Sequence, residues 1–136
     1  MLLMQLKNNE KFAFLNLAYY IANIDGEFEQ EEKNTIEEYC AEMGIENVAY
    51  NEDMFSLEDT LKQISSLKSK KIVLMELMIL IHSDDKFHRF EQGIIEKIAD
   101  NFYISKNQLV IYSQWGKMAS SLYQQGNLFL EDGLSV

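Results

Sequence analysis

Two apolar stretches dominate the pattern of hydrophobic and polar positions along the chain. The first runs from Phe12 to Ile24 and is interrupted by two asparagines, and the second runs from Ile72 to Ile81 and is interrupted by Glu76. Both are apolar around most of a helical circumference, which is typical of helices enclosed by others on several sides. Both also fall short of the roughly 20 apolar residues that a membrane span needs. We therefore expect two central helices and no transmembrane segment.

The sequence contains an internal repeat with an offset of 59 residues. Residues 15–45 align without gaps on residues 74–104, and each copy reads as an apolar helix, a tight turn and an amphipathic helix. The identities fall at polar as well as apolar positions: Leu15/Leu74, Asp25/Asp84, Phe28/Phe87, Glu32/Glu91, Ile36/Ile95, Glu37/Glu96 and Ile45/Ile104. The repeat predicts two helix pairs, at about 11–45 and 70–104, related by approximate two-fold symmetry.

Serine residues mark the expected starts of further helices. Ser56 is followed three residues later by an aspartate and Ser105 by a glutamine, a spacing typical of capping boxes. Ser69 is the expected N-cap of the second central helix. The sequence lacks proline, so we predict an all-α fold in a single domain, residues 1–136, with six to seven helices and a C-terminal helix at about 106–125.

The charge of the chain is concentrated in one segment. The sequence has 22 acidic and 12 basic residues, a net charge of −10, and the window from Asp25 to Asp59 holds 13 acidic residues and one lysine. Nucleic-acid binding depends on clustered lysine and arginine, so nucleic acid is not an expected partner. The window predicts a solvated acidic face, or alternatively a surface that docks a basic protein.

Each repeat places an aspartate in its turn and a glutamate seven residues later. The pairs are Asp25 with Glu32 and Asp84 with Glu91. Hard divalent cations prefer several oxygen ligands, which a turn and the helix that follows it can supply. These four residues are therefore candidate metal ligands.

Further ligands lie around each turn. In the first repeat, Asn23 and Glu29 occupy ligand positions of a 12-residue calcium loop, but its first position is Ile21, which argues against a true EF-hand. In the second repeat, His82 and His88 flank the turn and would suit a transition metal, with surface histidines as the default interpretation. The alternative for both motifs is structural, because the aspartates can end one helix while the glutamates accept hydrogen bonds from free amides of the next.

The chain resembles the TerB-like family, the small helical domain of tellurite-resistance proteins that also forms the N-terminal region of a membrane-anchored DnaJ-type co-chaperone. The resemblance rests on Ile24–Phe28 with Glu32, repeated as Ser83–Phe87 with Glu91, and covers about residues 11–125. It implies a helical bundle whose turn acids, first of all those of the first motif, chelate a divalent metal. It also implies a role in a stress-response or membrane-associated assembly rather than in turnover.

Other conspicuous residues are expected to be structural. Glu76 interrupts an apolar helix, and we expect it at that helix's exposed edge, with a buried acid as the alternative. Cys40 lies on a core stripe and is expected to be an inert thiol. Tyr112, Trp115 and Met118 recur at helical spacing and are expected in the core.

The motifs together predict a non-enzymatic module. The sequence has no phosphate-binding glycine loop, nucleophile elbow, CxxC pair or HExxH motif, so we expect neither catalysis nor an organic cofactor. The first hypothesis is a TerB-like module that binds a divalent metal of unknown identity. The alternative is a metal-independent interaction module that uses the acidic face from Glu27 to Asp59. A single cysteine and an N-terminus without a signal-peptide pattern predict a cytoplasmic protein.

Overall fold

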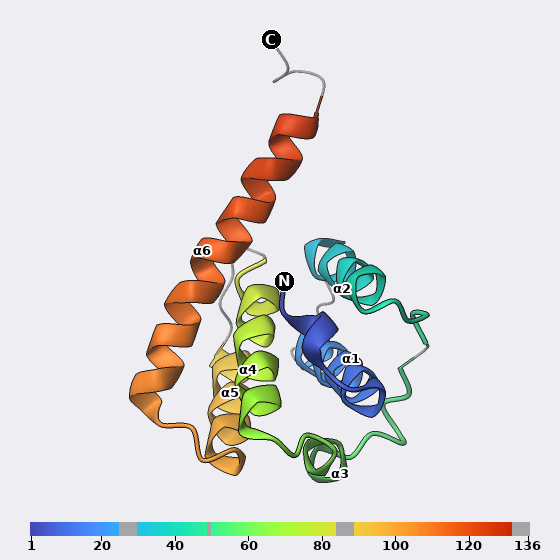
Figure 1. Ribbon diagram of the computed structural model, residues 1–136, viewed down its shortest axis with the longest axis vertical. Helices are drawn as coiled ribbons and strands as arrows, with labels where there is room; N and C mark the ends of the chain where they lie inside the picture. The colour runs from blue at the N-terminus through green and yellow to red at the C-terminus, as the bar shows by residue number, and fades with distance from the viewer. Residues whose placement is uncertain (25–29, 49, 84–88, 132–136) are drawn as a thin grey trace.

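Helices make up the secondary structure of the computed structural model in the residues that it describes, 1–24, 30–48, 50–83 and 89–131 (Figure 1). This part of the chain contains six α-helices and no strand, which confirms the predicted all-α class. The elements are the 3-10 turn η1 (Leu3–Gln5), α1 (Asn8–Asn23), α2 (Gln30–Met43), α3 (Leu57–Lys62), α4 (Leu67–Ile81), α5 (Arg89–Asn101) and α6 (Lys106–Leu130).

The helix boundaries follow the sequence repeat. Helix α4 begins 59 residues after α1. The buried positions correspond as well: Ile36 and Ile95 are fully buried, as are Met43 and Phe102. Helices α1 and α2 thus lie in the first sequence repeat and α4 and α5 in the second, while the symmetry between the two repeats stays a prediction.

Both helix pairs end in the same backbone conformation. Gly44 follows α2 with a φ of 68°, and Tyr103, 59 residues later, follows α5 with a φ of 57°. After each, the next amide donates to a carbonyl five residues back, Ile45 to Cys40 at 3.1 Å and Ile104 to Ala99 at 2.9 Å. This is the hydrogen bond of a Schellman motif, which satisfies a carbonyl at the end of a helix.

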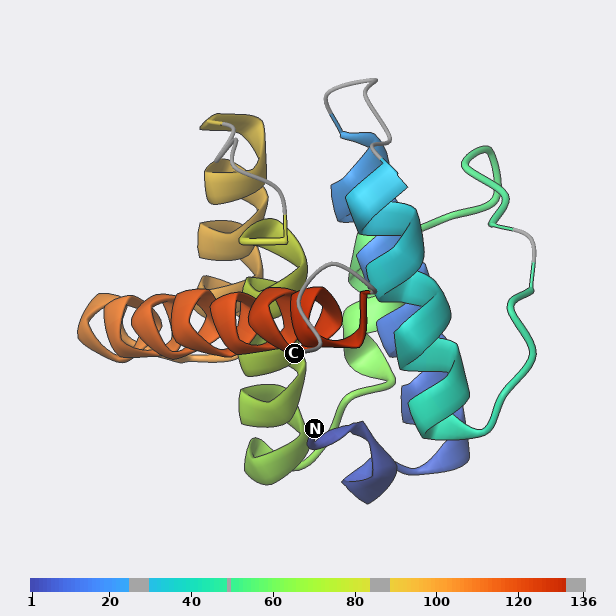
Figure 2. The same cartoon turned by 90° about the horizontal axis from the view of Figure 1, so that it is seen from above.

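Helix α4 lies at the centre of the bundle and α6 lies across it (Figure 2). The close approach is possible at Gly116 of α6, because a Cβ built there would be 2.5 Å from the Cβ of Met78 and 2.8 Å from its carbonyl carbon. Leu109 and Ala119 are buried on the same face of α6. Because Gly116 has no side chain, this face of α6 can approach the bundle closely enough to pack against it.

The helix starts confirm two of three expected caps. Ser56 accepts a hydrogen bond from the amide of Asp59, and Ser105 forms a full capping box with Gln108. The expectation for Ser69 is wrong, because the N-cap of α4 is Ser66, whose hydroxyl accepts from the Ser69 amide at 3.0 Å. Ser69 is buried one turn into the helix, where its hydroxyl donates to Glu10 at 3.1 Å.

The C-terminal helix is longer than the sequence pattern predicts. It continues to Leu130 instead of ending near residue 125, and its last three residues are exposed. Met118, expected in the core, is 61% exposed, so that expectation is wrong, while Tyr112 and Trp115 are half-buried. One face of α6 therefore carries apolar side chains that the bundle does not cover.

Candidate functional site

The predicted metal motif is only partly within the described residues. Asp25, Glu29, Asp84 and His88 lie outside them. The two motif glutamates are described, and both are buried: Glu32 is 3% exposed at the start of α2, and Glu91 is 2% exposed at the start of α5. The structure thus places both carboxylates in the first described turn of the second helix of their pair.

The two described accessory ligands make other contacts. The Asn23 side-chain amide donates to the Tyr19 carbonyl at 2.8 Å, one turn back in α1. The His82 ring lies against α6, with its Nε2 3.0 Å from the Ser113 hydroxyl, and burial together with nearby Lys117 lowers the pKa of this histidine. Among the described residues, no three histidine, cysteine or acidic side chains gather as a metal cluster.

A groove of about 420 Å³ opens between α2 and α6, with the end of α4 at its floor. We name it the α2/α6 groove. One wall is acidic, with Glu31, Glu38 and Glu42 along one face of α2. The other wall is polar and uncharged, and it comes from α6: Ser120, Tyr123, Gln124 and Asn127. Neither lysine nor arginine is among the described residues that line it.

Two tyrosines keep neutral hydroxyl groups beside these acids. Tyr39 is buried, and its hydroxyl donates to the Glu76 carbonyl at 2.5 Å. Burial and the nearby carboxylate of Glu76 raise its pKa well above the usual value. Burial and the carboxylates of Glu42 and Glu76 likewise raise the pKa of Tyr123. The groove therefore keeps its negative charge on α2 and offers neutral donors opposite.

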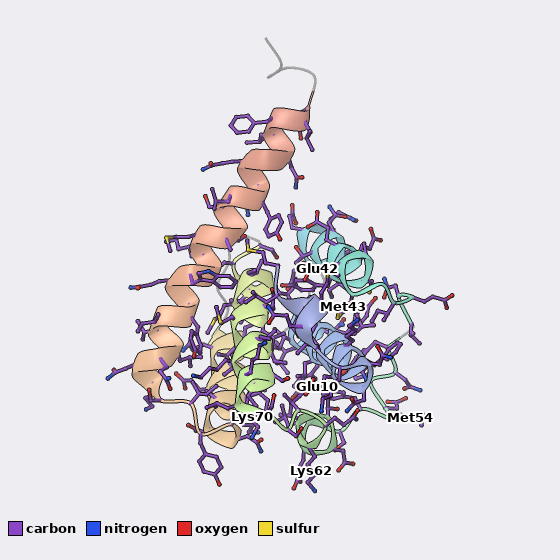
Figure 3. All side chains as sticks on the ribbon, in the orientation of Figure 1. Glu10, Glu42, Met43, Met54, Lys62 and Lys70 are labelled. Atoms are coloured by element: carbon purple, nitrogen blue, oxygen red, sulfur yellow. The ribbon has the colours of Figure 1, made fainter. Side chains whose placement is uncertain are left out.

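Beside the groove, Glu42 of α2, which Figure 3 labels, and Glu76 of α4 hold the first residues of the chain. The Met1 amine donates to Glu42 at 2.5 Å and to Glu76 at 3.0 Å. The Leu2 amide donates to Glu76 at 2.7 Å and the Leu3 amide to Glu42 at 2.8 Å. Four hydrogen bonds thus fix η1 against α2 and α4.

Glu76 corrects a sequence expectation. It was expected at the exposed edge of its helix, but its side chain is fully buried. Burial raises its pKa, although the Leu2 amide and the Met1 amine act in the opposite direction. The cause of the error is that the covering donors come from residues 74 and 75 positions away, which no local pattern reveals. Cys40 behaves as expected: it is buried, and burial raises the pKa of its thiol.

The rest of the acidic window is solvated. Exposed carboxylates of the described residues continue from α2 through the following loop to α3: Glu37, Glu46, Glu52, Asp53, Glu58 and Asp59. Glu58 forms an ion pair with Lys62, with the charged atoms 3.8 Å apart on exposed positions of α3. Such a pair contributes little, so the window is a source of negative potential more than of stability.

Sequence reasoning missed the contribution of α6 to the groove. Its groove residues recur every three or four positions, Ser120, Tyr123, Gln124 and Asn127, which places them on one helical face. That spacing was readable in the sequence as a polar stripe. The sequence pattern does not reveal which helix faces this stripe, because the packing of α6 across α4 is what brings α6 beside α2.

The comparisons with known proteins found no relative of this chain. No family model, no curated protein and no solved structure matches this chain. Within the described residues, none of the helices has the length and apolar character needed to cross a membrane.

Proposed function

We propose that this chain is a non-enzymatic, TerB-like binding module whose α2/α6 groove takes a basic segment of a protein partner. The observation that carries the proposal is the placement of Glu31, Glu38 and Glu42 along one wall of a groove whose opposite wall is uncharged. A lysine or arginine side chain that enters the groove meets carboxylates on one side and neutral polar groups on the other. Charge-assisted hydrogen bonds to carboxylates are among the strongest that proteins make.

The surrounding charge supports the same partner. The acidic window extends from the groove along α2 and the loop that follows, so a basic chain is attracted before it is bound. The groove itself provides the specific contacts. We therefore expect binding that weakens steeply with salt and depends on the groove acids more than on acids elsewhere in the window.

The test uses a fluorescein-labelled octalysine peptide and fluorescence anisotropy. The double variant Glu31→Gln with Glu38→Gln removes two groove charges and leaves Glu42 to hold η1. We expect its affinity to fall about tenfold, roughly 1.4 kcal/mol. The matched control, Glu52→Gln with Glu58→Gln, removes the same charge from exposed positions outside the groove and is expected to change affinity less than about twofold.

Three results would contradict the proposal. They are absence of peptide binding at low salt, an affinity that is the same at low and high salt, and equal losses in the groove variant and its control. The last result would mean that only the total charge matters. Circular dichroism of each variant establishes that the fold is retained.

A second function, divalent cation binding at the Asp-turn-Glu motifs, is favoured by the burial of Glu32 and Glu91 at equivalent helix starts. A buried carboxylate must be compensated by hydrogen bonds or by a cation. The first motif is the better candidate, because it belongs to the acidic window, whereas lysine and arginine follow the second aspartate. The group bound would be a cation that accepts oxygen ligands, such as calcium, magnesium or manganese.

Thermal unfolding tests this second function. A cation present at 100 times its dissociation constant stabilises the folded chain by about 2.7 kcal/mol, which raises the melting temperature by several degrees. Asp25→Asn with Glu32→Gln should abolish the response, and Asp84→Asn with Glu91→Gln should retain it. Equal melting temperatures in EDTA and in each of the metals, zinc included, would exclude a site of useful affinity.

A further inference from the structure

The outer face of α6 carries an apolar stripe along the length of the helix. The large side chains at its centre and ends are mostly exposed: Ile111 is 60%, Met118 61%, Leu122 63% and Phe129 69% exposed. Trp115 is half-buried between the first two. In this stretch α6 forms the edge of the molecule, with α4 and α5 on one side only (Figure 1). No described helix covers the stripe.

The stripe lies away from the face that packs on the bundle. Successive residues of an α-helix are rotated by about 100°, so Ile111, Trp115, Met118, Leu122 and Phe129 fall within an arc of about 60°. The packed face, centred on Gly116 and Ser120, is more than a quarter turn away. Helix α6 thus packs on the bundle through a face of mainly small and polar residues and leaves its most apolar face uncovered.

The spacing of the stripe is that of a coiled-coil seam. The positions are 111, 115, 118, 122, 125 and 129, separated alternately by four and three residues, which is the a and d pattern of heptads. Apart from Gln125, every seam residue is large and apolar. The flanking positions, which include Gln114 and Ser121, carry no charge. The seam fits another helix with the same spacing, and nothing beside it repels a copy of itself.

We propose that α6 pairs antiparallel with α6 of a second copy of this chain. In the register that centres the seam on itself, each a position meets a d position of the second copy. Ile111 then lies opposite Phe129 of the second copy, Met118 opposite Leu122, and Trp115 opposite Gln125, whose amide oxygen can accept a hydrogen bond from the indole. The one polar residue of the seam thus meets the only other seam side chain that carries a polar hydrogen, the Trp115 indole, which selects this register.

The area available reaches the range of specific dimers. Side chains of this size expose roughly 200 Å² when free, so seam residues exposed by six or seven tenths supply on the order of 500 Å² per copy. Two copies bury about 1,000 Å² before the flanks are counted, which reaches the lower limit for a specific interface. The helix has 25 residues and is about 37 Å long, sufficient for the three heptads that the seam spans.

The charge distribution favours a second copy in this orientation. Helix α6 has two lysines and no acidic residue, while the acidic window lies on α2 and α3, on the other side of the molecule (Figure 1). The α2/α6 groove is lined by the C-terminal half of α6. In an antiparallel pair these halves point in opposite directions, so the two acidic regions lie at opposite ends and repel each other least.

Sedimentation equilibrium with paired variants tests the proposal. We expect the wild-type chain at ~100 μM to have twice the monomer mass of 15.9 kDa. Met118→Glu with Leu122→Glu places two carboxylates in the seam and is expected to weaken the dimer at least 100-fold. The matched control, Val110→Glu with Leu130→Glu, adds the same charge at exposed apolar positions of α6 that belong neither to the seam nor to its flanks, and its dimer constant should stay within about threefold.

A wild-type chain that is monomeric at that concentration would overturn the proposal, and so would a control that dissociates as readily as the seam variant. Because all four positions are exposed, the variants are expected to fold, which far-UV circular dichroism measures. The outcome does not depend on the α2/α6 groove, so the octalysine experiment can succeed or fail separately.

Disulfide trapping tests the orientation. Positions 111 and 129 are about 27 Å apart along α6, so in an antiparallel pair neither meets its own counterpart. Ile111→Cys and Phe129→Cys should each remain uncrosslinked alone and form a mixed disulfide when combined. Disulfide dimers formed by each variant alone would indicate a parallel pair and overturn the antiparallel register. The native Cys40 is buried and serves as the unreactive background.

Discussion

The two helix pairs are similar in length and differ in what covers them. Helices α1 and α4 begin 59 residues apart, and the pairs end in the same Schellman hydrogen bond. The first pair packs against the short helix α3 and keeps the acidic side of α2 exposed, whereas the second pair is crossed by the long helix α6. The repeated sequence thus sets helix ends and buried positions, while the segments outside the repeat set the surfaces on which binding takes place.

A single pair of equivalent positions shows how far the difference extends. Leu17 of α1 and Glu76 of α4 are 59 residues apart, and both side chains are fully buried. The leucine is covered by the apolar core, and the glutamate accepts hydrogen bonds from the first residues of the chain. The same place in the repeat therefore holds an apolar contact in one pair and a polar anchor in the other.

The largest expected effect comes from adding a side chain at Gly116, where α6 crosses the second pair. Gly116→Ala should lower the free energy of unfolding by about 1 to 3 kcal/mol, because the added Cβ would stand 2.5 Å from the Cβ of Met78 and the helices would have to separate. Gly126→Ala, in the same helix but with no atom within 4 Å of its Cβ, should gain up to about 1 kcal/mol. Urea unfolding of both variants measures the contrast, and equal stabilities would mean that the crossing at Gly116 is not tight.

A smaller effect of opposite sign in the two pairs is expected at the helix ends. Gly44→Ala in the first pair should cost about 1 kcal/mol, since a side chain is strained at a φ of 68°. Tyr103→Gly in the second pair should gain about 0.5 to 1 kcal/mol, because the tyrosine already bears that strain and its ring is 93% exposed. Tyr103→Ala removes the ring and keeps the strain, so its stability should change little. Thermal unfolding of the three variants gives the signs, and a loss for Tyr103→Gly would show that the ring contributes to packing.

The sequence predicted what depends on local pattern and failed where distant segments meet. Helix class, the two pairs, the capping box at Ser105 and the buried Cys40 follow from spacing alone. Met118 was misplaced because the most apolar face of α6 is not the one that packs, and the close approach at Gly116 brings a face of small residues against the bundle. Glu76 was misplaced because its donors lie more than 70 residues away. The metal motif could be located in the sequence, but its aspartates lie outside the described residues, so its ligand geometry stays a prediction.

The smallest expected effect is a dependence of stability on pH, which we expect from Glu76 in the second pair and not from Leu17 in the first. Burial raises the pKa of Glu76 above its ordinary value of 4.5, so the folded chain holds this proton more tightly than the unfolded chain. The resulting stabilisation is complete below pH 4.5 and is lost as the pH rises through the folded-state pKa. The loss is limited because the Leu2 amide and the Met1 amine still favour the ionised carboxylate.

Glu76→Gln isolates this contribution, since the amide keeps an oxygen to accept the Leu2 hydrogen bond and has no proton to lose. We expect the stability of the wild type, measured relative to the variant by urea unfolding, to decrease between about pH 4 and pH 7. Leu17→Val at the equivalent apolar position should lower the free energy of unfolding by about 0.5 to 1.5 kcal/mol, because it removes buried apolar volume. The loss should be the same at every pH in that range, because no ionisable group is changed. The opposite result would be an increase in the stability of the wild type relative to the glutamine variant as the pH rises. It would mean that the ion pair with the Met1 amine stabilises the ionised carboxylate by more than burial destabilises it. Glu76 would then be an electrostatic anchor for η1 and not a buried acid that favours its proton.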